Sequence, residues 1–448
     1  MADSGDSPAP TSKFAIIAGI SALLLAGMIS GASLWVIAAI TAGILVGLNS
    51  FLAKNWSTAT SASRQGDDRE VKLGSRVPVE IELTNHSKIP VLWLLVEDLF
   101  PRWATLFDPP TLQVEGDRVQ VFLLWGGQTR SLCYEFKCNR RGYFQIGPTV
   151  METGDMMGMY RRYRVGTQPQ YITVLPNIVP LTSYEIGSRR PIGEIRMRDN
   201  IMDDPTRLRG IRQWQPGDPM RSVHWAATAR TGTLHSKIYE PSSIVGATLI
   251  LDLHESTTPV AHEPVRSDLA ITAAASIANS LHDSNEPVGL ATNGRDAADR
   301  IRLEGWVGDH RVRDAATSAG SMANENERLR PIICAPSRGP VNFQEIVRTL
   351  ARLERTDGLT LPQLLVECES QLSAETTLLV ILQQCTPEAM GALIELQRRG
   401  RAVAVIINTH DINDYSSIAG PLIAARIPTF HLSSADTIAE VCRQTLLR

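Results

Sequence analysis

Residues 207–240 read RLRGIRQWQPGDPMRSVHWAATARTGTLHSKIYE, and this stretch lies between two regions with different hydrophobic patterns. It contains five arginines, one lysine, two tryptophans and two histidines, but only two acidic residues, Asp218 and Glu240. Because arginine, tryptophan and histidine side chains commonly bind partners, this stretch is the first candidate for a functional surface. It also marks the boundary between two domains.

On its C-terminal side, residues 243–448 alternate between apolar runs and helical patterns. Val245–Leu253 is typical of a buried parallel strand, with Asp252 near its end. We expect further strands at 287–292, 301–307, 377–382, 402–407 and 429–432, and helices at 267–282, 343–353, 361–372, 388–399, 418–425 and 437–447. This alternation predicts an α/β doubly wound parallel sheet, which binds ligands beyond the carboxyl ends of its strands.

On its N-terminal side, residues 70–180 contain short strands in which apolar and polar residues alternate. We expect strands at 77–83, 91–96, 119–123, 132–138, 143–146 and 171–175. Their spacing predicts an antiparallel β-sandwich, immunoglobulin-like in the loose sense. Alternation places Cys133 and Cys138 on opposite faces of one strand, so they cannot pair. We interpret all six cysteines as free thiols in a reducing compartment.

Residues 14–53, which follow a tail at 1–13, contain no Asp, Glu, Lys, Arg or His. They predict a transmembrane hairpin of two helices, at about 14–29 and 34–53, in contact with the lipid bilayer. A cleaved signal peptide is the alternative, but Asp3 and Asp6 precede the only N-terminal cation, Lys13. Lys13, Lys54 and Arg64 flank the hairpin on one side, which predicts a two-pass protein of the cell membrane with its soluble domains in the cytoplasm. Residues 54–69 resemble a polar linker.

The arginine-rich stretch belongs to a connector at 181–242. Arg221–Arg230 fits one short helix, on which Arg221, Trp225 and Thr228 would share a face. One interpretation is an interdomain staple that involves Arg221, Trp225 and Arg230. The others are a docking surface for an acidic partner or phosphate, and a nucleic-acid patch. His224 and His235 lack a third metal ligand at suitable spacing.

These features resemble one bacterial family, the "domain of unknown function 58" (DUF58) proteins. The resemblance covers the hairpin, the β region, the arginine-rich signature and the α/β domain. In the β region it rests on Arg140–Tyr143 and Gly154-Asp155. The signature residues that match the family pattern are Arg209, Gln215, Pro216, Gly217, Asp218, Arg221, His224, Trp225, Thr228, Ala229, Arg230 and Gly232. The resemblance implies an α/β domain similar to a von Willebrand factor A domain. It also implies a MoxR-type AAA+ ATPase as partner, in chaperone-like assembly or maturation of protein complexes.

The von Willebrand pattern would place Mg²⁺ at an Asp-x-Ser-x-Ser motif after the first strand. Here that segment reads DLHES, so Asp252 and Ser256 remain as candidate ligands, but His254 replaces the first serine. The loop after 377–382 reads QQCT and supplies no carboxylate. Because imidazole is a poor Mg²⁺ ligand, we expect no bound metal and no other cofactor.

Three functions are compatible with the sequence. The first is a membrane-anchored, non-enzymatic adaptor for protein–protein interaction. The second is a hydrolase of unknown substrate, for which Cys385 is a conceivable nucleophile; the chain has no G-x-S-x-G, HExxH, Walker A or Gly-rich dinucleotide motif. The third is binding of phosphate or nucleic acid through the arginine-rich stretch, which a net charge of −3 disfavours. We expect the adaptor.

Overall fold

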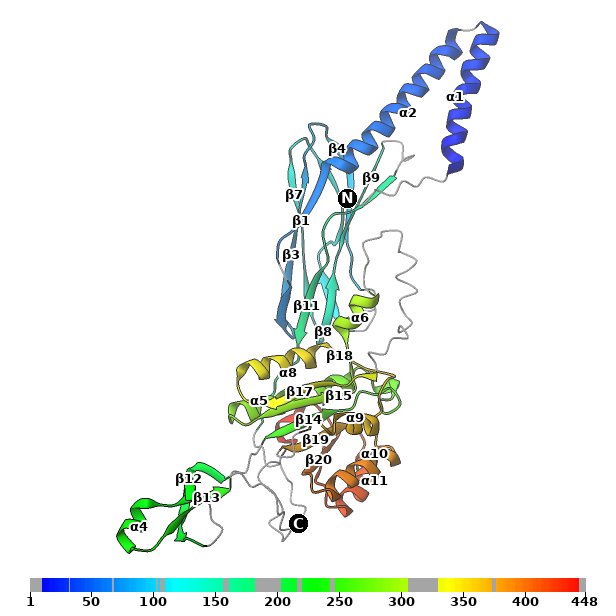
Figure 1. Ribbon diagram of the computed structural model, residues 1–448. Helices are drawn as coiled ribbons and strands as arrows, with labels where there is room; N and C mark the ends of the chain where they lie inside the picture. The colour runs from blue at the N-terminus through cyan, green and yellow to red at the C-terminus, as the bar shows by residue number, and fades with distance from the viewer. Residues whose placement is uncertain are drawn as a thin grey trace.

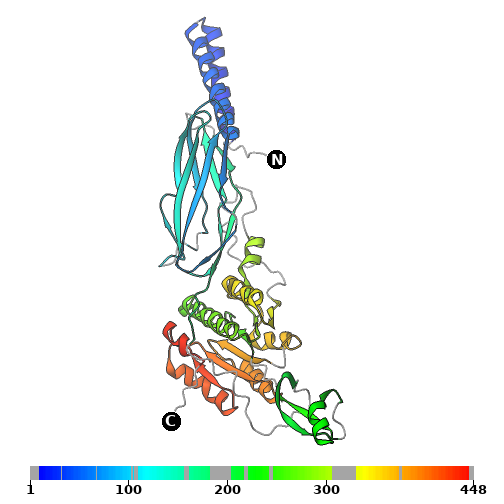
Figure 2. The same ribbon diagram turned by 90° about the vertical axis from the view of Figure 1, so that its left-hand side faces the viewer.

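The computed structural model describes residues 10–31, 33–66, 68–101, 104, 109–155, 161–181, 203–215, 220–241, 246–304, 329–372 and 376–442. Two helices lie at one end of the molecule (Figure 1). Along the length of the molecule, the β region lies next to the helices and the α/β region lies beyond it. A small module made from the arginine-rich stretch lies at the far end, although it precedes the α/β region in the chain. Figure 2 shows the same order from the side.

The N-terminal helices α1 (Pro10–Ser30) and α2 (Ser33–Ala59) pack against each other. Their close approach depends on Gly27, because a Cβ there would lie 2.9 Å from Cγ2 of Val36. Two helices joined by a very short turn were predicted, and the structure confirms them. Among the described side chains, α2 is the one helix long and apolar enough to cross a membrane, and α1 contributes a shorter apolar run, Ile17–Ile29.

The predicted polar linker at 54–69 is wrong. Helix α2 continues to Ala59 and leads directly into strand β1 (Thr60–Arg64), which pairs with β3 (Arg76–Asn85). Trp56 is buried in the core of the β region, and Nη1 of Arg164 donates to the carbonyl oxygen of Thr60 at 3.1 Å. The apolar helix is thus joined to the β region without a spacer.

The β region is built from three sheets, with strand orders β1-β3-β7-β5, β10-β9-β4-β6 and β2-β11-β8. Besides β1 and β3, its strands are β2 (Arg69–Lys72), β4 (Val91–Asp98), β5 (Leu112–Glu115), β6 (Val119–Leu124), β7 (Thr129–Cys138), β8 (Gly142–Ile146), β9 (Thr149–Gly154), β10 (Arg161–Val165) and β11 (Gln170–Leu175). All pairs are antiparallel except β11 with β2, which is parallel and departs from the prediction. Cys133 is exposed and Cys138 buried, which confirms that they face opposite sides.

The α/β region has one six-stranded sheet in the order β17-β15-β14-β19-β20-β21. Its strands are β14 (Ala247–Leu251), β15 (Val288–Thr292), β17 (Ile332–Ser337), β19 (Thr377–Leu382), β20 (Val403–Ile407) and β21 (Thr429–His431). Its helices are α5 (Val265–Asp283), α6 (Ala297–Glu304), α8 (Pro340–Arg352), α9 (Leu361–Cys368), α10 (Pro387–Arg398) and α11 (Ile412–Ala424). Short elements complete it: η3 (Val260–His262), η6 (Ala435–Glu440), and the pair β16 (Arg295–Asp296) and β18 (Leu353–Glu354).

Three predictions for this region need correction. Edge strand β17 was missed and runs antiparallel to β15, so the sheet is mixed rather than wholly parallel. Residues 301–304 end helix α6 instead of beginning a strand. The closing helix predicted at 437–447 is a 3₁₀ helix over Ala435–Glu440, and residues 443–448 lie outside the described ones.

Arg141, in the turn before β8, fastens the β region to the α/β region. Its Nε lies 2.9 Å from Oδ1 of Asp268 on α5, and its Nη1 donates to the carbonyl oxygen of Leu353 at 2.8 Å. The arginine side chain is 10% exposed. A peripheral pair, Arg348 with Glu70, also spans the two regions at 2.5 Å. The turn thus joins two strands of different sheets, β7 and β8, and its Arg141 makes a largely buried contact between the two regions.

We expect Arg141→Ala to weaken this junction by about 2–5 kcal/mol, because it leaves a carboxylate and backbone carbonyls unpaired at a largely buried site. Hydrogen exchange in α5 and proteolysis at residues 176–181 should both accelerate. The matched control is Arg76→Ala, since Arg76 is 59% exposed and makes only surface ion pairs. Equal rates of hydrogen exchange and of proteolysis in the two variants would contradict this role for Arg141.

Candidate functional site

The arginine-rich stretch folds into a small module, residues 203–241. Strand β12 (Asp203–Gln213) pairs antiparallel with β13 (His235–Pro241), and between them lie η2 (Met220–Ser222) and helix α4 (Trp225–Thr231). The hairpin was not predicted, since the sequence there shows no alternation. Of the module's described apolar side chains, Val223 is the one that is buried.

Several signature residues hold this module together. Nδ1 of His224 accepts the Ala227 N–H at 3.0 Å and caps the N-terminus of α4. Oγ1 of Thr228 accepts the His235 N–H at 3.1 Å, which joins the helix to β13. Gly232 ends α4 with a φ of 71°, a conformation that favours glycine. His224, Thr228 and Gly232 are therefore explained by the folding of the module.

Trp225 and Arg230 are exposed, and no contact within the described residues gives their side chains such a role. The Trp225 side chain is 64% exposed, and Ala226, Ala229 and Arg230 are exposed on the same helix. Three further large apolar residues of the module are also exposed: Ile211, Met220 and Leu234. An exposed apolar surface in a module with so small a core is typical of an interaction site. We call Trp225, Ala226, Ala229 and Arg230 the α4 face.

The described residues of the module carry positive charge. Arg212, Arg230 and Lys237 lie in the ranges 210–215 and 220–237, where no Asp or Glu is described. Tryptophan and arginine together are the residues most often found at energetic centres of protein interfaces. The α4 face therefore suits a partner that offers carboxylates around an apolar groove.

The other predicted site residues are only partly described. Arg209 lies in β12 and Arg221 in η2, but their side chains are outside the described residues, as are Gly217 and Asp218 altogether. The helix begins at Trp225, so a common helical face for Arg221, Trp225 and Thr228 is wrong. Trp225 and Arg230 are exposed, and Arg141 makes a buried contact between the two regions, so the staple interpretation of Trp225 and Arg230 stays a prediction that no described contact supports.

The candidate Mg²⁺ ligands are engaged in hydrogen bonds that hold the loop after β14. Asp252 is buried; its Oδ1 accepts from Nδ2 of Asn293 and its Oδ2 from Oγ1 of Thr257, both at 2.7 Å. Oγ of Ser256 lies 2.7 Å from Nδ1 of His254, so its described hydrogen bond is with His254 and not with Asp252. Burial raises the pKa of Asp252 despite these bonds. This donor set does not fit Mg²⁺, which needs oxygen ligands in near-octahedral geometry.

Cys385 follows β19 at the same edge of the sheet, but its environment does not activate a nucleophile. Burial, with a smaller contribution from the Asp252 carboxylate, raises the pKa of its thiol to about 11. Catalytic cysteines have a lowered pKa. Cys385 directly precedes the N-cap Thr386 of α10, yet burial keeps the pKa of its thiol high, which does not favour the thiolate that a cysteine hydrolase requires.

We expect Cys385 in the folded protein to be alkylated at least tenfold more slowly than exposed Cys133 at neutral pH, because few of its thiols are ionised. Its rate should rise about tenfold per pH unit until the pH approaches 11. Mass spectrometry of iodoacetamide-treated protein measures both sites. Faster labelling of Cys385 than of Cys133 would revive the hydrolase hypothesis.

Comparisons with known proteins agree with the motif residues. Residues 210–305 match the family described as "Protein of unknown function DUF58". The chain is 24% identical over 237 residues to the uncharacterized protein YeaD of Bacillus subtilis (strain 168), a match that covers 52% of this chain and 56% of YeaD. The chain thus spans just over half the length of this relative.

Among solved structures, the pilus adhesin SpaC from Lactobacillus rhamnosus GG is similar with a TM-score of 0.29 and 13% identity, over 43% of this chain and 29% of SpaC. The CARDB domain of the PF1109 protein from Pyrococcus furiosus has a TM-score of 0.18 and 12% identity, over 26% of this chain and 87% of that domain. Likenesses this distant say nothing about function. The family match is specific: residues 210–305 form a DUF58 segment, and the chain is a distant homologue of YeaD.

Proposed function

We propose that this protein is a membrane-anchored, non-enzymatic adaptor that docks a MoxR-type AAA+ ATPase on the α4 face. The observation that carries the proposal is the exposure of Trp225 and Arg230 within the family-matched segment. Their neighbours in the signature fold the module, whereas these two side chains are left for a partner. The AAA+ ATPase itself comes from the family resemblance, which implies such a partner in complex assembly or maturation.

The proposed anchor is α1 together with α2. Helix α2 passes the length and hydropathy requirements for a membrane span, and its last turns pack into the β region through Trp56. Cleavage after α2 would remove a helix on which the β-region core depends, and this supports α2 as a retained anchor. The flanking cations Lys13 and Lys54 favour cytoplasmic soluble domains, where an ATPase has ATP.

The finer fold assignment belongs to the same proposal. The sheet order, with an antiparallel edge strand β17 beside β15, is compatible with a von Willebrand factor A-like domain, and the β region with an immunoglobulin-like sandwich. Both are folds that commonly carry interaction surfaces rather than catalytic groups. The engaged hydrogen bonds of Asp252 and the raised pKa of Cys385 also favour a non-enzymatic role.

The test is affinity purification of the full chain from detergent-solubilised membranes, with and without ATP, followed by mass spectrometry. We expect an AAA+ ATPase to be recovered in stoichiometric amounts in at least one nucleotide state. Failure to recover one with ATP present would contradict the proposal. Recovery of nucleic acid, with binding that falls steeply as salt rises, would instead favour the nucleic-acid hypothesis.

A further inference from the structure

The β region contains a pocket of about 620 Å³ between the end of β1 and the segment that joins β10 to β11. This volume is within the range of sites for small molecules. Strands β1 and β10 are edge strands of two different sheets, so the pocket lies where the sandwich is open. Its ten lining residues include no aromatic and no large aliphatic side chain, which excludes a hydrophobic ligand.

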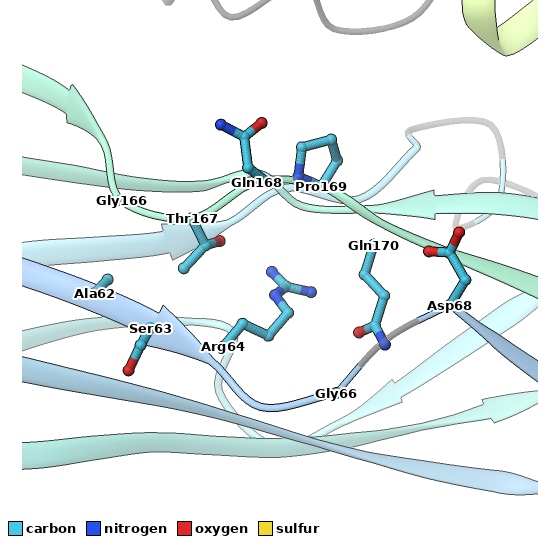
Figure 3. A pocket seen from close by; sticks show the side chains of 10 residues that line it. All are labelled: Ala62, Ser63, Arg64, Gly66, Asp68, Gly166, Thr167, Gln168, Pro169 and Gln170. Atoms are coloured by element: carbon cyan, nitrogen blue, oxygen red, sulfur yellow. The ribbon is translucent and has the colours of Figure 1, made fainter. Parts of the chain in front are cut away.

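Arg64 is the central side chain of this pocket. Figure 3 shows its guanidinium pointing into the space bounded by Thr167 on one side and Gln170 on the other. The side chain is only 5% exposed. Its Nη2 donates to Oδ1 of Asp98 and, at 3.1 Å, to Oγ1 of Thr149.

The remaining donors of Arg64 are unused within the part of the chain that the structure describes. Nε and Nη1 are buried without a hydrogen-bond partner there. A guanidinium has five N–H groups, so three are left after the two on Nη2. A buried donor without a partner destabilises the fold, and a ligand with oxygen acceptors would supply the missing partners.

The charges around the pocket define the kind of ligand. Asp98 already neutralises Arg64, and the carboxylate of Asp68 lies at the far end of the pocket from Ala62 (Figure 3). The backbone N–H of Tyr171 fixes this carboxylate by donating to Oδ1 at 2.8 Å. Gly66 also lines the pocket, and the guanidinium of Arg69 lies next to it. Among the side chains that the structure describes around the pocket, these four charges sum to zero, which favours a ligand without net charge.

We infer that this pocket binds a small zwitterion, an amino acid or a short peptide. Its carboxylate accepts from Nε and Nη1 of Arg64, and its ammonium group meets Asp68. A simple anion would satisfy Arg64 but would leave an excess negative charge beside Asp68 and Asp98. The site is separate from the α4 face, so the two proposals stand or fall independently.

The probes are alanine and trialanine, titrated calorimetrically into the full chain in detergent micelles, with N-acetyl-trialanine amide as the probe without charged ends. We expect at least one zwitterion to bind and the blocked peptide to bind at least about tenfold more weakly. Binding of alanine as tightly as trialanine identifies a free amino acid, and binding of trialanine alone identifies a peptide. If neither zwitterion binds at millimolar concentration, or the blocked peptide binds equally well, the inference is wrong.

Two variants locate the site. Arg64→Lys keeps a cation for Asp98 but removes the spare donors, and Asp68→Asn removes the carboxylate at an exposed position. Each should weaken zwitterion binding at least about tenfold, whereas Arg76→Lys, at an exposed site elsewhere on the β region, should not. Thermal unfolding checks that Arg64→Lys folds; if it does not, Asp68→Asn decides. Unchanged affinity in Asp68→Asn would overturn the assignment.

Discussion

Replacing Asp98 with alanine is expected to lower the free energy of unfolding of the β region by about 3–5 kcal/mol, because it leaves the buried Arg64 cation without a counter-charge. The Asp98 side chain is fully buried. Its Oδ1 accepts from Arg64 and, at 3.0 Å, from Oγ1 of Thr149, and its Oδ2 accepts from the Tyr134 hydroxyl. Burial and the Asp98 charge both raise the pKa of Tyr134, so this hydroxyl stays a donor. One carboxylate therefore joins β1, β4, β7 and β9.

Hydrogen exchange of the full chain measures this loss where it occurs. Amides of β3 and β7 should exchange faster in Asp98→Ala, while those of β14 and β19 in the α/β region should change little. Glu115→Ala is the matched control, since Glu115 makes a half-exposed ion pair with Arg76 at 3.3 Å and should cost at most about 1 kcal/mol. If Asp98→Ala and Glu115→Ala were equally stable, the buried pair would not support the fold as described.

Trp225→Ala should weaken binding of the AAA+ ATPase by about 2 kcal/mol or more, roughly thirtyfold, with little change in thermal stability. The physical reason is that a 64% exposed tryptophan contributes little to its own fold and buries a large area only in a complex. Arg230→Ala should act in the same direction, and more weakly at high salt, because its contribution is electrostatic.

Trp125→Ala provides a control of the same chemistry. Trp125 is 62% exposed, but it follows β6 in the β region and does not belong to the module. It should leave ATPase binding unchanged. Equal losses in both variants would indicate a general effect of surface tryptophans, and a large fall in melting temperature in Trp225→Ala would mean that this residue stabilises the module.

Local patterns predicted the regular elements well. Strand β19 (Thr377–Leu382) was predicted to the residue, because a continuous apolar run identifies it. The helix hairpin was predicted at the right place, but α1 begins four residues earlier and α2 ends six residues later than expected. Strand β6 was predicted at the right place, but Val121 is exposed and Phe122 buried, because the larger ring occupies the core. Strand β17 was missed, because IICAPS is short and ends in Pro336 and Ser337.

Contacts between distant residues could not be predicted. Arg64 follows an apolar helix and was expected to flank the membrane hairpin as a cation that sets its orientation. In the structure it pairs instead with Asp98, 34 residues away, inside the β region. Arg141 was noted only within a motif that carries the family resemblance, yet its side chain contacts Leu353 across 212 residues. In the module, composition identified the signature but could not separate His224 and Thr228, which fold it, from Trp225 and Arg230, which are exposed.

The most direct test of the docking claim is site-specific photo-crosslinking in intact membranes. A photoreactive amino acid is placed at Ala229 on the α4 face and, as control, at Val366 on α9, which is 70% exposed. We expect an adduct with an AAA+ ATPase from position 229 and none from position 366. An adduct from position 366 but not from 229, or none from either while the ATPase co-purifies, would show that the partner docks elsewhere.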